Sequence, residues 1–320
     1  MTLALLFSPQ GSQLVGMGRD LAARSDAARA TFAEADGTLG WSLSQTCWEG
    51  PRERLDDTRQ TQPCLLTTSV AAYRALEERV ELEPGMVAGH SVGEYAALVA
   101  AGVLGFPAAL RLVARRAELM ADIDTDGGMA AIIGLDRATV EAVVASVARP
   151  TELVVANDNA PGQVVISGTR ACLAAAEEPL RAAGAKRVLP LPVSGAFHSP
   201  FMSEVADCLA SAFADEEWRD ARVPIVSNVT AEPITDPGRI RALLAEQVRS
   251  PVEWVRSVER MSADGMDLAI ECGPGAALTG MLRRIVPEVR TANVADVASL
   301  EAALELLGSH AAAASAPVQP

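Results

Sequence analysis

This chain of 320 residues contains few of the residues on which several kinds of site depend. Lysine occurs once, as Lys186. A phosphate-binding loop of the Gly-Lys-Ser/Thr type is therefore absent, and a Schiff-base mechanism would have a single candidate. The 5 cysteines are scattered, odd in number and without a CxxC pair, which argues against a disulfide framework and a zinc site. We therefore expect neither a bound metal nor disulfide bonds.

Charge and hydropathy exclude further classes of protein. The formal net charge of −14 would repel phosphate, so nucleic acid is not expected as a partner. The opening apolar run from Leu3 to Phe7 is too short to span a membrane and lacks the basic start of a signal peptide. No other run approaches membrane-spanning length. We expect a cytoplasmic protein that has no membrane partner.

The order of predicted elements indicates an α/β protein with an insertion. Leu3 to Phe7 and residues 86–88 are typical of buried strands, each followed by helical sequence. From residue 127 a strand–helix–strand–strand–helix–strand order favours a small ferredoxin-like unit. We expect a larger α/β body formed by residues 1–126 and 193–305, and the insert at residues 127–192. The low-complexity residues 306–320 are expected to form a disordered tail.

The pentapeptide Gly89-His-Ser-Val-Gly93 follows one of these strands and precedes an alanine-rich helix. A Gly-x-Ser-x-Gly sequence in that context lifts a serine hydroxyl clear of a sharp bend, where glycines leave room for the backbone. The helix that follows favours negative charge on the reacting oxygen. Alone, the pattern is weak, because a glycine-flanked turn serine occurs by chance. In this setting we interpret Ser91 as a nucleophile.

A serine needs a nearby base, and imidazole is the usual one. The chain has 3 histidines, His90, His198 and His310. His90 adjoins the serine in a tight bend and should point away from it, and His310 lies in the expected tail. His198 remains, in a loop after the insert. A lone loop histidine is commonly a surface residue, and it is the serine's need for a partner that favours the catalytic interpretation.

In these and further motifs the chain resembles a known family. The family comprises the malonyl-CoA:acyl-carrier-protein transacylases of fatty acid synthesis and the related acyltransferases of polyketide synthases. The resemblance extends from Phe7 to about Ile285. It is carried by Gln10-Gly-Ser-Gln13, Thr61-Gln-Pro63, Gly89-His-Ser-Val-Gly-Glu94, Arg115-Arg116, Pro161-Gly-Gln-Val-Val165, Gly195-Ala-Phe-His198, Gln247 before Pro251-Val252, and Gly273-Pro-Gly275. So many motifs in this order are highly specific.

The resemblance implies a fold, a reaction and partners. The fold would be an α/β-hydrolase-like body with a ferredoxin-like insert. Ser91 would be acylated, His198 would be the base, and the backbone carbonyl of Gln247 would orient the imidazole. The N–H groups of Gln10 and Val92 would form the oxyanion hole. Malonyl-CoA and an acyl carrier protein would be the partners, and no metal or redox cofactor would be needed.

The same resemblance suggests residues that contact the substrate. Arg116 matches the arginine that binds the free malonyl carboxylate, although a solvated helix arginine is the plain alternative and the choice between Arg115 and Arg116 is the weakest step. Phe197 resembles a bulky residue of malonyl-selective members, or else simply packs its loop. Asn157, Asn159 and Gln62 match polar residues of the family's cleft, but asparagine is common in turns anyway.

Two questions stay open in the sequence. The family usually has Phe-Pro-Gly-Gln-Gly at the first loop, whereas this chain has Phe7-Ser-Pro-Gln-Gly11, and a proline at position 9 puts the position of the Gln10 N–H in doubt. An acyl hydrolase with the same nucleophile and base, a transferase for another acyl unit, and a non-catalytic docking module are the alternatives. A basic patch for an acidic carrier protein would have as candidates Lys186, Arg187, Arg283 and Arg284.

Overall fold

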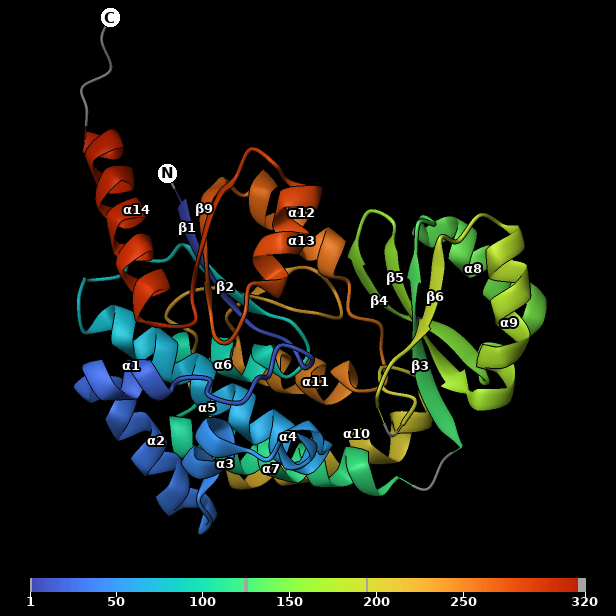
Figure 1. The fold of residues 1–320 in the computed structure, drawn as a ribbon, viewed down its shortest axis with the longest axis horizontal. Helices are drawn as coiled ribbons and strands as arrows, with labels where there is room; N and C mark the ends of the chain where they lie inside the picture. Colours follow the sequence, from blue (N-terminus) through green and yellow to red (C-terminus); the bar gives the residue numbers. More distant parts are fainter. Residues whose placement is uncertain (1, 124–125, 194, 316–320) are drawn as a thin grey trace, which may run out of the picture.

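The computed structural model describes residues 2–123, 126–193 and 195–315 (Figure 1). The body contains a six-stranded sheet in the order β10-β9-β1-β2-β7-β8, parallel except for the β7–β8 pair. Its strands are β1 Thr2–Phe7, β2 Met86–Gly89, β7 Ile225–Val226, β8 Pro233–Ile234, β9 Met266–Cys272 and β10 Arg290–Val294. An α/β body was expected, and it is confirmed.

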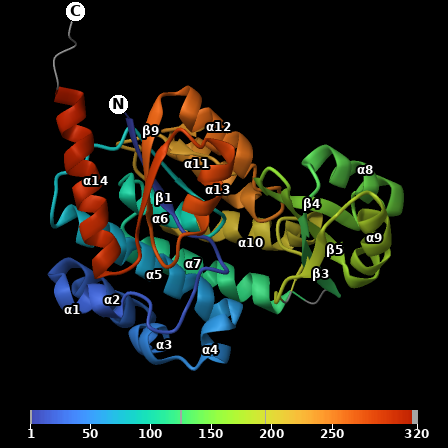
Figure 2. The ribbon, with the colours of Figure 1, turned by 45° about the horizontal axis from the view of Figure 1, so that its top comes forward.

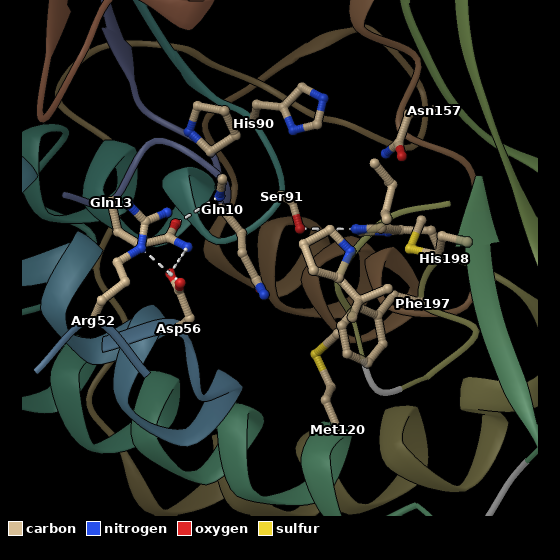
Figure 3. Close-up of a pocket in the computed structure, with 16 residues that line it drawn as sticks. Gln10, Gln13, Arg52, Asp56, His90, Ser91, Met120, Asn157, Phe197 and His198 are labelled. Atoms are coloured by element: carbon tan, nitrogen blue, oxygen red, sulfur yellow. Dashed lines mark hydrogen bonds and ion pairs between the residues drawn. The ribbon is translucent and has the colours of Figure 1, made fainter. Parts of the chain in front are cut away.

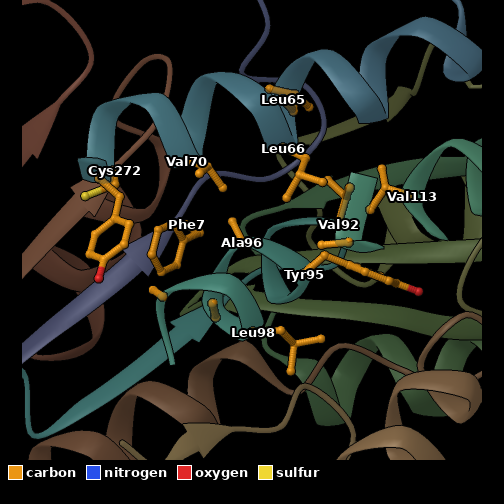
Figure 4. Close-up of a cluster of buried hydrophobic side chains, with 14 of the residues drawn as sticks. Phe7, Leu65, Leu66, Val70, Val92, Tyr95, Ala96, Leu98, Val113 and Cys272 are labelled. Carbon is orange, nitrogen blue, oxygen red and sulfur yellow. The ribbon is translucent and has the colours of Figure 1, made fainter. Parts of the chain in front are cut away.

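Strand β1 lies in the middle of this sheet because both of its faces are apolar. Leu3, Leu5 and Phe7 contact one hydrophobic cluster, whereas Ala4 and Leu6 contact another on the opposite face. Figure 4 shows part of the first cluster, with side chains from β1, α5, α6 and α7 packed together. A central strand covered on both faces is rigid, and the loop that follows it starts from a fixed point.

Helices cover both faces of the sheet (Figures 1 and 2). Helices α12 and α13 supply side chains to the second cluster, and most of the other helices pack against the first. The helices of the body are α1 Arg19–Arg24, α2 Asp26–Leu39, α3 Leu43–Glu49, α4 Arg52–Asp56, α5 Thr58–Glu77, α6 Gly93–Ala100, α7 Phe106–Asp122, α10 Ser203–Ala212, α11 Pro237–Gln247, α12 Trp254–Ala263, α13 Ala277–Ile285 and α14 Val297–Ser315, with 3₁₀ helices at Pro200–Met202 and Phe213–Asp215.

The second sheet is antiparallel and has the strand order β4-β5-β3-β6 of a ferredoxin-like unit. It forms a separate lobe with its own hydrophobic cluster, drawn in green and yellow in Figure 1. Its elements are β3 Gly127–Ile133, α8 Arg137–Val147, β4 Leu153–Ala160, β5 Gln163–Thr169, α9 Arg170–Ala182 and β6 Arg187–Pro190. Backbone hydrogen bonds between the β4 segment and Val252 join this lobe to the body.

The register of the large sheet brings two loops together. Phe7, the last residue of β1, pairs with Gly89, the last residue of β2. Because both strands run in the same direction, the chain segments that leave them begin side by side. These segments are residues 8–13 and the Ser91 bend, which are the two motifs that the sequence singles out. The carboxyl ends of parallel strands are the usual place for a site in such a sheet.

The C-terminal segment differs from the disordered tail that we expected at residues 306–320. Helix α14 continues to Ser315, and its Leu300 and Ala303 are buried in the first cluster. Alanine has the highest helix propensity, so the alanine-rich stretch extends a helix that packing has already fixed. His310 also differs from expectation, because it is buried and lies 3.6 Å from Asp267. Residues 316–320 lie outside the described residues.

Within the described residues, none of the helices combines the length and the apolar character needed to cross a membrane.

Candidate active site

Ser91 lies at a sharp bend between β2 and α6. Its φ of 53° is in the left-handed region, which non-glycine residues seldom adopt. A Cβ on Gly89 would lie 2.0 Å from the carbonyl of Gly93, and a Cβ on Gly93 would lie 2.2 Å from the carbonyl oxygen of Phe7. Both flanking positions therefore require glycine, because the backbone passes closer than any side chain allows.

The side chain of Asn228, a residue that follows β7, forms hydrogen bonds to the backbone of this bend. Its Oδ1 accepts the N–H of Ser91 over 2.7 Å, and its Nδ2 donates to the carbonyl of Gly89 over 2.7 Å. Asn228 is fully buried, so the two hydrogen bonds do not compete with water. They stabilise the strained conformation of Ser91, which supports the view that the bend is a functional feature.

The Ser91 hydroxyl meets the imidazole of His198. Oγ lies 2.8 Å from Nε2 (Figure 3). Nδ1 lies 2.9 Å from the backbone carbonyl oxygen of Gln247. A carbonyl only accepts, so Nδ1 carries the proton and donates it, and Nε2 accepts from the serine. The structure thus brings together the serine and the histidine that the sequence indicates, with the Gln247 carbonyl where a triad would have a carboxylate.

The environment keeps His198 uncharged. Burial, followed by the positive charge of Arg116, lowers the pKa of the imidazole from 6.5 to about 3. The neutral ring is the form that can take a proton from a hydroxyl. His198 also has a positive φ of 57°, and its N–H donates to the carbonyl of Val248 over 2.9 Å. The base is therefore fixed at both its ring and its backbone.

Arg116, on α7, lies behind the serine. It is 1% exposed, whereas Arg115 points outward and pairs with Glu118. The reason is helical spacing, because Arg116 lies four residues from both Leu112 and Met120 on the buried face. Its Nη2 donates to Ser91 Oγ over 3.1 Å. A buried guanidinium in contact with the nucleophile is an unusual arrangement and a candidate anion site.

Two glutamines complete the surroundings of the guanidinium. Nη1 donates to Oε1 of Gln62 over 2.6 Å, and Nη2 donates to Oε1 of Gln247 over 3.2 Å. Within the described residues the buried Nε of Arg116 has no hydrogen-bond partner. Burial lowers the pKa of Arg116, but its side chain keeps its charge in proteins. Among the described residues, the guanidinium therefore donates only to neutral acceptors.

A cavity of about 340 Å³ opens in front of Ser91 and His198. Its apolar part includes Met120, Met129 and Phe197, and Figure 3 shows Phe197 beside the histidine. Arg116 is not among the lining residues, so a bound carboxylate would reach the guanidinium by exchanging with one of its present partners. The lining is Pro9, Gln10, Gly11, Gln13, Arg52, Asp56, His90, Ser91, Met120, Met129, Asn157, Leu191, Pro192, Val193, Phe197 and His198.

The two asparagines lie on β4 and differ in their contacts. Asn157 lines the cavity. Asn159 Oδ1 lies 2.8 Å from Nε2 of His90. The His90 ring also packs against Trp254, with 5.5 Å between the ring centroids. Burial lowers the pKa of His90 to about 4, so its Nε2–H donates to the amide oxygen. His90 thus lines the cavity, but its hydrogen-bond partner is Asn159 on β4. The hydroxyl of Ser91 is hydrogen-bonded to His198 instead.

The backbone N–H groups of Gln10 and Val92 are both without an acceptor in the described part of the chain. Val92 is the first residue before α6, where helix N–H groups lack intrahelical partners. In the first loop the positive φ falls at Gly11, with 98°, whereas Pro9, two residues earlier, has no positive φ. Both N–H groups are therefore available as donors with Pro9 in place, and the oxyanion hole that they would form stays a prediction.

The candidate basic residues separate into two places. Lys186 packs over Gly134 at the end of β3, and the neighbouring turn is contacted by Arg284, which donates to Gln163 Oε1 over 2.8 Å. Arg283 instead donates to Thr291 on β10. Arg187 begins β6 and is exposed. A basic patch for carrier-protein docking that draws on Lys186, Arg187, Arg283 and Arg284 stays a prediction.

Two functional candidates were missed in the sequence analysis. Asn228 was not singled out, because no local pattern reveals that its amide reaches a bend 137 residues away. Glu94 was noted as part of a motif without a role. It is 3% exposed, and its Oε2 accepts the Nε2 of Gln247 over 2.6 Å. A carboxylate directly after Gly-x-Ser-x-Gly, in an otherwise apolar helix, was the available signal.

The profile of the acyl transferase domain matches residues 4–304 of this chain. The chain belongs to the acyl transferase domain family. Among its curated relatives, the malonyl CoA-acyl carrier protein transacylase of Escherichia coli K12 is 44% identical over 95% of this chain and 99% of its own length. The enzyme of the same name from Bacillus subtilis is 41% identical over 95% and 97%.

Solved structures of this acyl transferase family have the same fold. An acyl carrier protein S-malonyltransferase from Vibrio cholerae is 43% identical, with a TM-score of 0.92 over 95% of this chain and 100% of its own. A malonyl-transacylase solved in complex with a type II polyketide synthase acyl-carrier protein is 41% identical, with a TM-score of 0.92 over 96% and 100%. These likenesses confirm the expected family and fold.

Proposed function

We propose that this protein transfers a malonyl group from malonyl-CoA to the phosphopantetheine thiol of an acyl carrier protein. The observation that carries the proposal is the hydrogen bond from Arg116 to Ser91, because it places a buried cation within reach of an acyl group on the nucleophile. A guanidinium binds a carboxylate through two parallel hydrogen bonds. The malonyl transferases among the relatives support the same substrate and partner.

The first half of the reaction acylates the enzyme. The Ser91 oxygen attacks the thioester carbonyl while its proton passes to Nε2 of His198. The N–H groups of Gln10 and Val92 donate to the oxygen that becomes negative, and each such donor contributes about 10²–10³-fold in rate. The C–S bond then breaks, and the coenzyme A sulfur leaves with the proton from His198. The product is a malonyl ester on Ser91.

The second half repeats these steps with the carrier protein. Its thiol gives a proton to His198, and the resulting thiolate attacks the ester carbonyl. Ser91 Oγ leaves and takes the proton back, so the enzyme returns to its first state. Exchange between two thioesters changes no oxidation state, and a serine, a neutral imidazole and oriented donors supply the chemistry. We therefore propose that no metal or redox cofactor takes part.

We further propose that the protein acts in the cytoplasm. Its five cysteines, Cys47, Cys64, Cys172, Cys208 and Cys272, are free thiols. Free thiols are typical of a reducing compartment.

The proposal is tested by following the acyl group. The pure protein is incubated with malonyl-CoA, and the adduct is located by peptide mass spectrometry before and after addition of a holo acyl carrier protein. We expect a malonyl ester on Ser91 that is stable alone and moves to the carrier thiol. Rapid loss of the adduct in the absence of carrier protein would instead indicate a hydrolase. No adduct at all would indicate a docking module, and Ser91→Ala serves as the blank.

A further inference from the structure

The buried carboxylate of Glu94 lies next to the site but takes no part in the mechanism above. It is on the first turn of α6, three residues after the nucleophile. Its Oε2 accepts hydrogen bonds from Nε2 of Gln247 over 2.6 Å and from the backbone N–H of Asn228 over 3.4 Å. Burying a carboxylate is costly, so its presence here calls for a reason.

The Gln247 amide connects Glu94 to Arg116. Its Nε2 donates to the carboxylate, and its Oε1 accepts from the guanidinium over 3.2 Å. Turning this amide over would place its NH₂ against a cation and its oxygen against an anion. The negative charge of Glu94 therefore sets which way the amide points. Nε2 also donates to the carbonyl of Ser91 over 3.0 Å, which fixes the same orientation.

Gln247 also contacts the base. Its backbone carbonyl accepts a hydrogen bond from Nδ1–H of His198 over 2.9 Å. One residue thus contacts the base through its main chain and the guanidinium through its side chain. A group that fixes the Gln247 side chain therefore influences the positions of both Arg116 and His198. We propose that Glu94 is a positioning residue which, through Gln247, holds Arg116 ready for a substrate carboxylate, and that it takes up a proton when that carboxylate binds. This inference rests on the proposed function.

The proton uptake follows from the charges. Burial is the main influence on the pKa of Glu94 and raises it to about 7, while Gln247, the Asn228 N–H and Arg116 act in the opposite direction. A malonyl carboxylate on Arg116 would cancel the contribution of the guanidinium and raise this pKa further. Near neutral pH, binding therefore converts a larger fraction of Glu94 to the neutral acid. An acetyl group brings no charge and leaves the pKa where it was.

The surroundings contain few competing groups. Helix α7 contributes Arg116, and Tyr95 on α6 has a pKa raised by burial beyond the neutral range. The pKa values of His90 and His198 are lowered to about 4 and about 3. Among the described residues, α5, β1 and β2, which also pack against α6, contribute no charge that acts on the pKa of Glu94.

The test measures kcat/KM for Ser91 acylation by malonyl-CoA and by acetyl-CoA between pH 6 and 8.5, and uses their ratio. The ratio cancels the ionisation of coenzyme A and of His198, which both substrates share. For the wild-type protein we expect the malonyl:acetyl ratio to rise as the pH falls toward about 7, by at most about tenfold per pH unit because one proton is linked, and to level off below that pH. A ratio that does not change with pH would overturn the proton uptake.

Two variants separate position from charge. Glu94→Gln keeps an acceptor for Gln247 but cannot ionise, so its ratio should stay malonyl-selective and lose its pH dependence. Glu94→Ala removes the acceptor, and its malonyl kcat/KM should fall about tenfold or more relative to acetyl, since about one hydrogen bond to a charged group is released. Equal losses for both substrates in Glu94→Ala, or an unaltered pH dependence in Glu94→Gln, would overturn the role.

Glu271→Gln is the matched control. Glu271 is also buried, at 1% exposed, but its oxygens accept from Ser8 and from N–H groups at the start of α13. Its variant should change neither the malonyl:acetyl ratio nor the pH dependence of that ratio. Thermal unfolding of each variant shows whether it is folded. If the wild-type protein forms no malonyl ester, the proposed function fails first, which is a different result from an ester that forms without the dependence on Glu94.

Discussion

Arg116 donates a hydrogen bond over 3.1 Å to the same Ser91 hydroxyl that faces the base. The arginine is on α7 and the serine is at the bend just before α6, so the packing of α6 against α7 sets this distance. A positive charge at the hydroxyl favours negative charge on Oγ as its proton leaves. After acylation the same guanidinium lies next to the bound acyl group. In the proposed reaction, one side chain would thus serve both the attack and the recognition of the substrate.

The first prediction concerns this arginine. Arg116→Ala should lower kcat/KM for malonyl-CoA by about 10²-fold or more, because about two charged hydrogen bonds to the carboxylate are lost, each worth about 1.5–3 kcal/mol. Acetyl-CoA, which has no carboxylate, should lose much less. Rates of Ser91 acylation by the two substrates give the comparison. Arg115→Ala, at an exposed neighbour, should leave both rates near wild type, and equal losses in Arg116→Ala would contradict the assigned role.

The second prediction concerns the pH dependence of the base. With the His198 pKa lowered to about 3, the ring keeps its free Nε2 as the pH falls until that value is approached. Acylation by acetyl-CoA should therefore be flat from pH 8 to pH 5. A histidine at its ordinary pKa of about 6.5 would lose about tenfold by pH 5.5. Arg116→Ala removes a charge that lowers this pKa, so the acid limb should move toward higher pH. A wild-type midpoint near 6.5 would refute this account.

The third prediction concerns the size of the substrate. Phe197 is buried, lines the cavity beside His198 and crowds the space in front of the serine. Phe197→Ser should increase acylation by methylmalonyl-CoA relative to malonyl-CoA, because the smaller side chain leaves room for a branch at the α-carbon. Phe201→Ser, at a phenylalanine outside the cavity lining, is the control for general loosening. An unchanged methylmalonyl:malonyl ratio in Phe197→Ser would show that another residue sets the limit.

The fourth prediction concerns the first loop. The buried Ser8 donates to Glu271 over 3.1 Å and so ties the loop that contains Gln10 to β9. Ser8→Ala should destabilise the protein by about 1–3 kcal/mol and lower acylation by both acyl-CoAs to the same degree, since the oxyanion donor serves every substrate. Ser12→Ala is the control in the same loop, because the Ser12 hydroxyl has no hydrogen-bond partner in the described part of the chain. Similar losses in Ser8→Ala and Ser12→Ala would argue against a role for the Ser8–Glu271 hydrogen bond.

Much of this arrangement could be predicted from local sequence. The Gly89-to-Gly93 motif gave the bend, because the glycines are required by close backbone contacts. Helical spacing from Leu112 and Met120 explains why Arg116 points inward, although the sequence alone left Arg115 open. Asn228 could not be found in this way, because its contact depends on how β7 packs beside β2. The extension of α14 was missed because a low-complexity composition was given more weight than helix propensity.

The bend at Ser91 depends on a part of the chain that is remote in sequence. Asn228 bridges Gly89 and Ser91, and Asn228 in turn accepts the backbone N–H of Glu253 just before α12. The native conformation of the nucleophile therefore depends on hydrogen bonds from the C-terminal half of the chain. A fragment that ends before β7 would contain the serine, its glycines, His198 and the arginine, but would lack the asparagine that holds the bend. Transplanting the reactive turn into another scaffold would require that asparagine to travel with it.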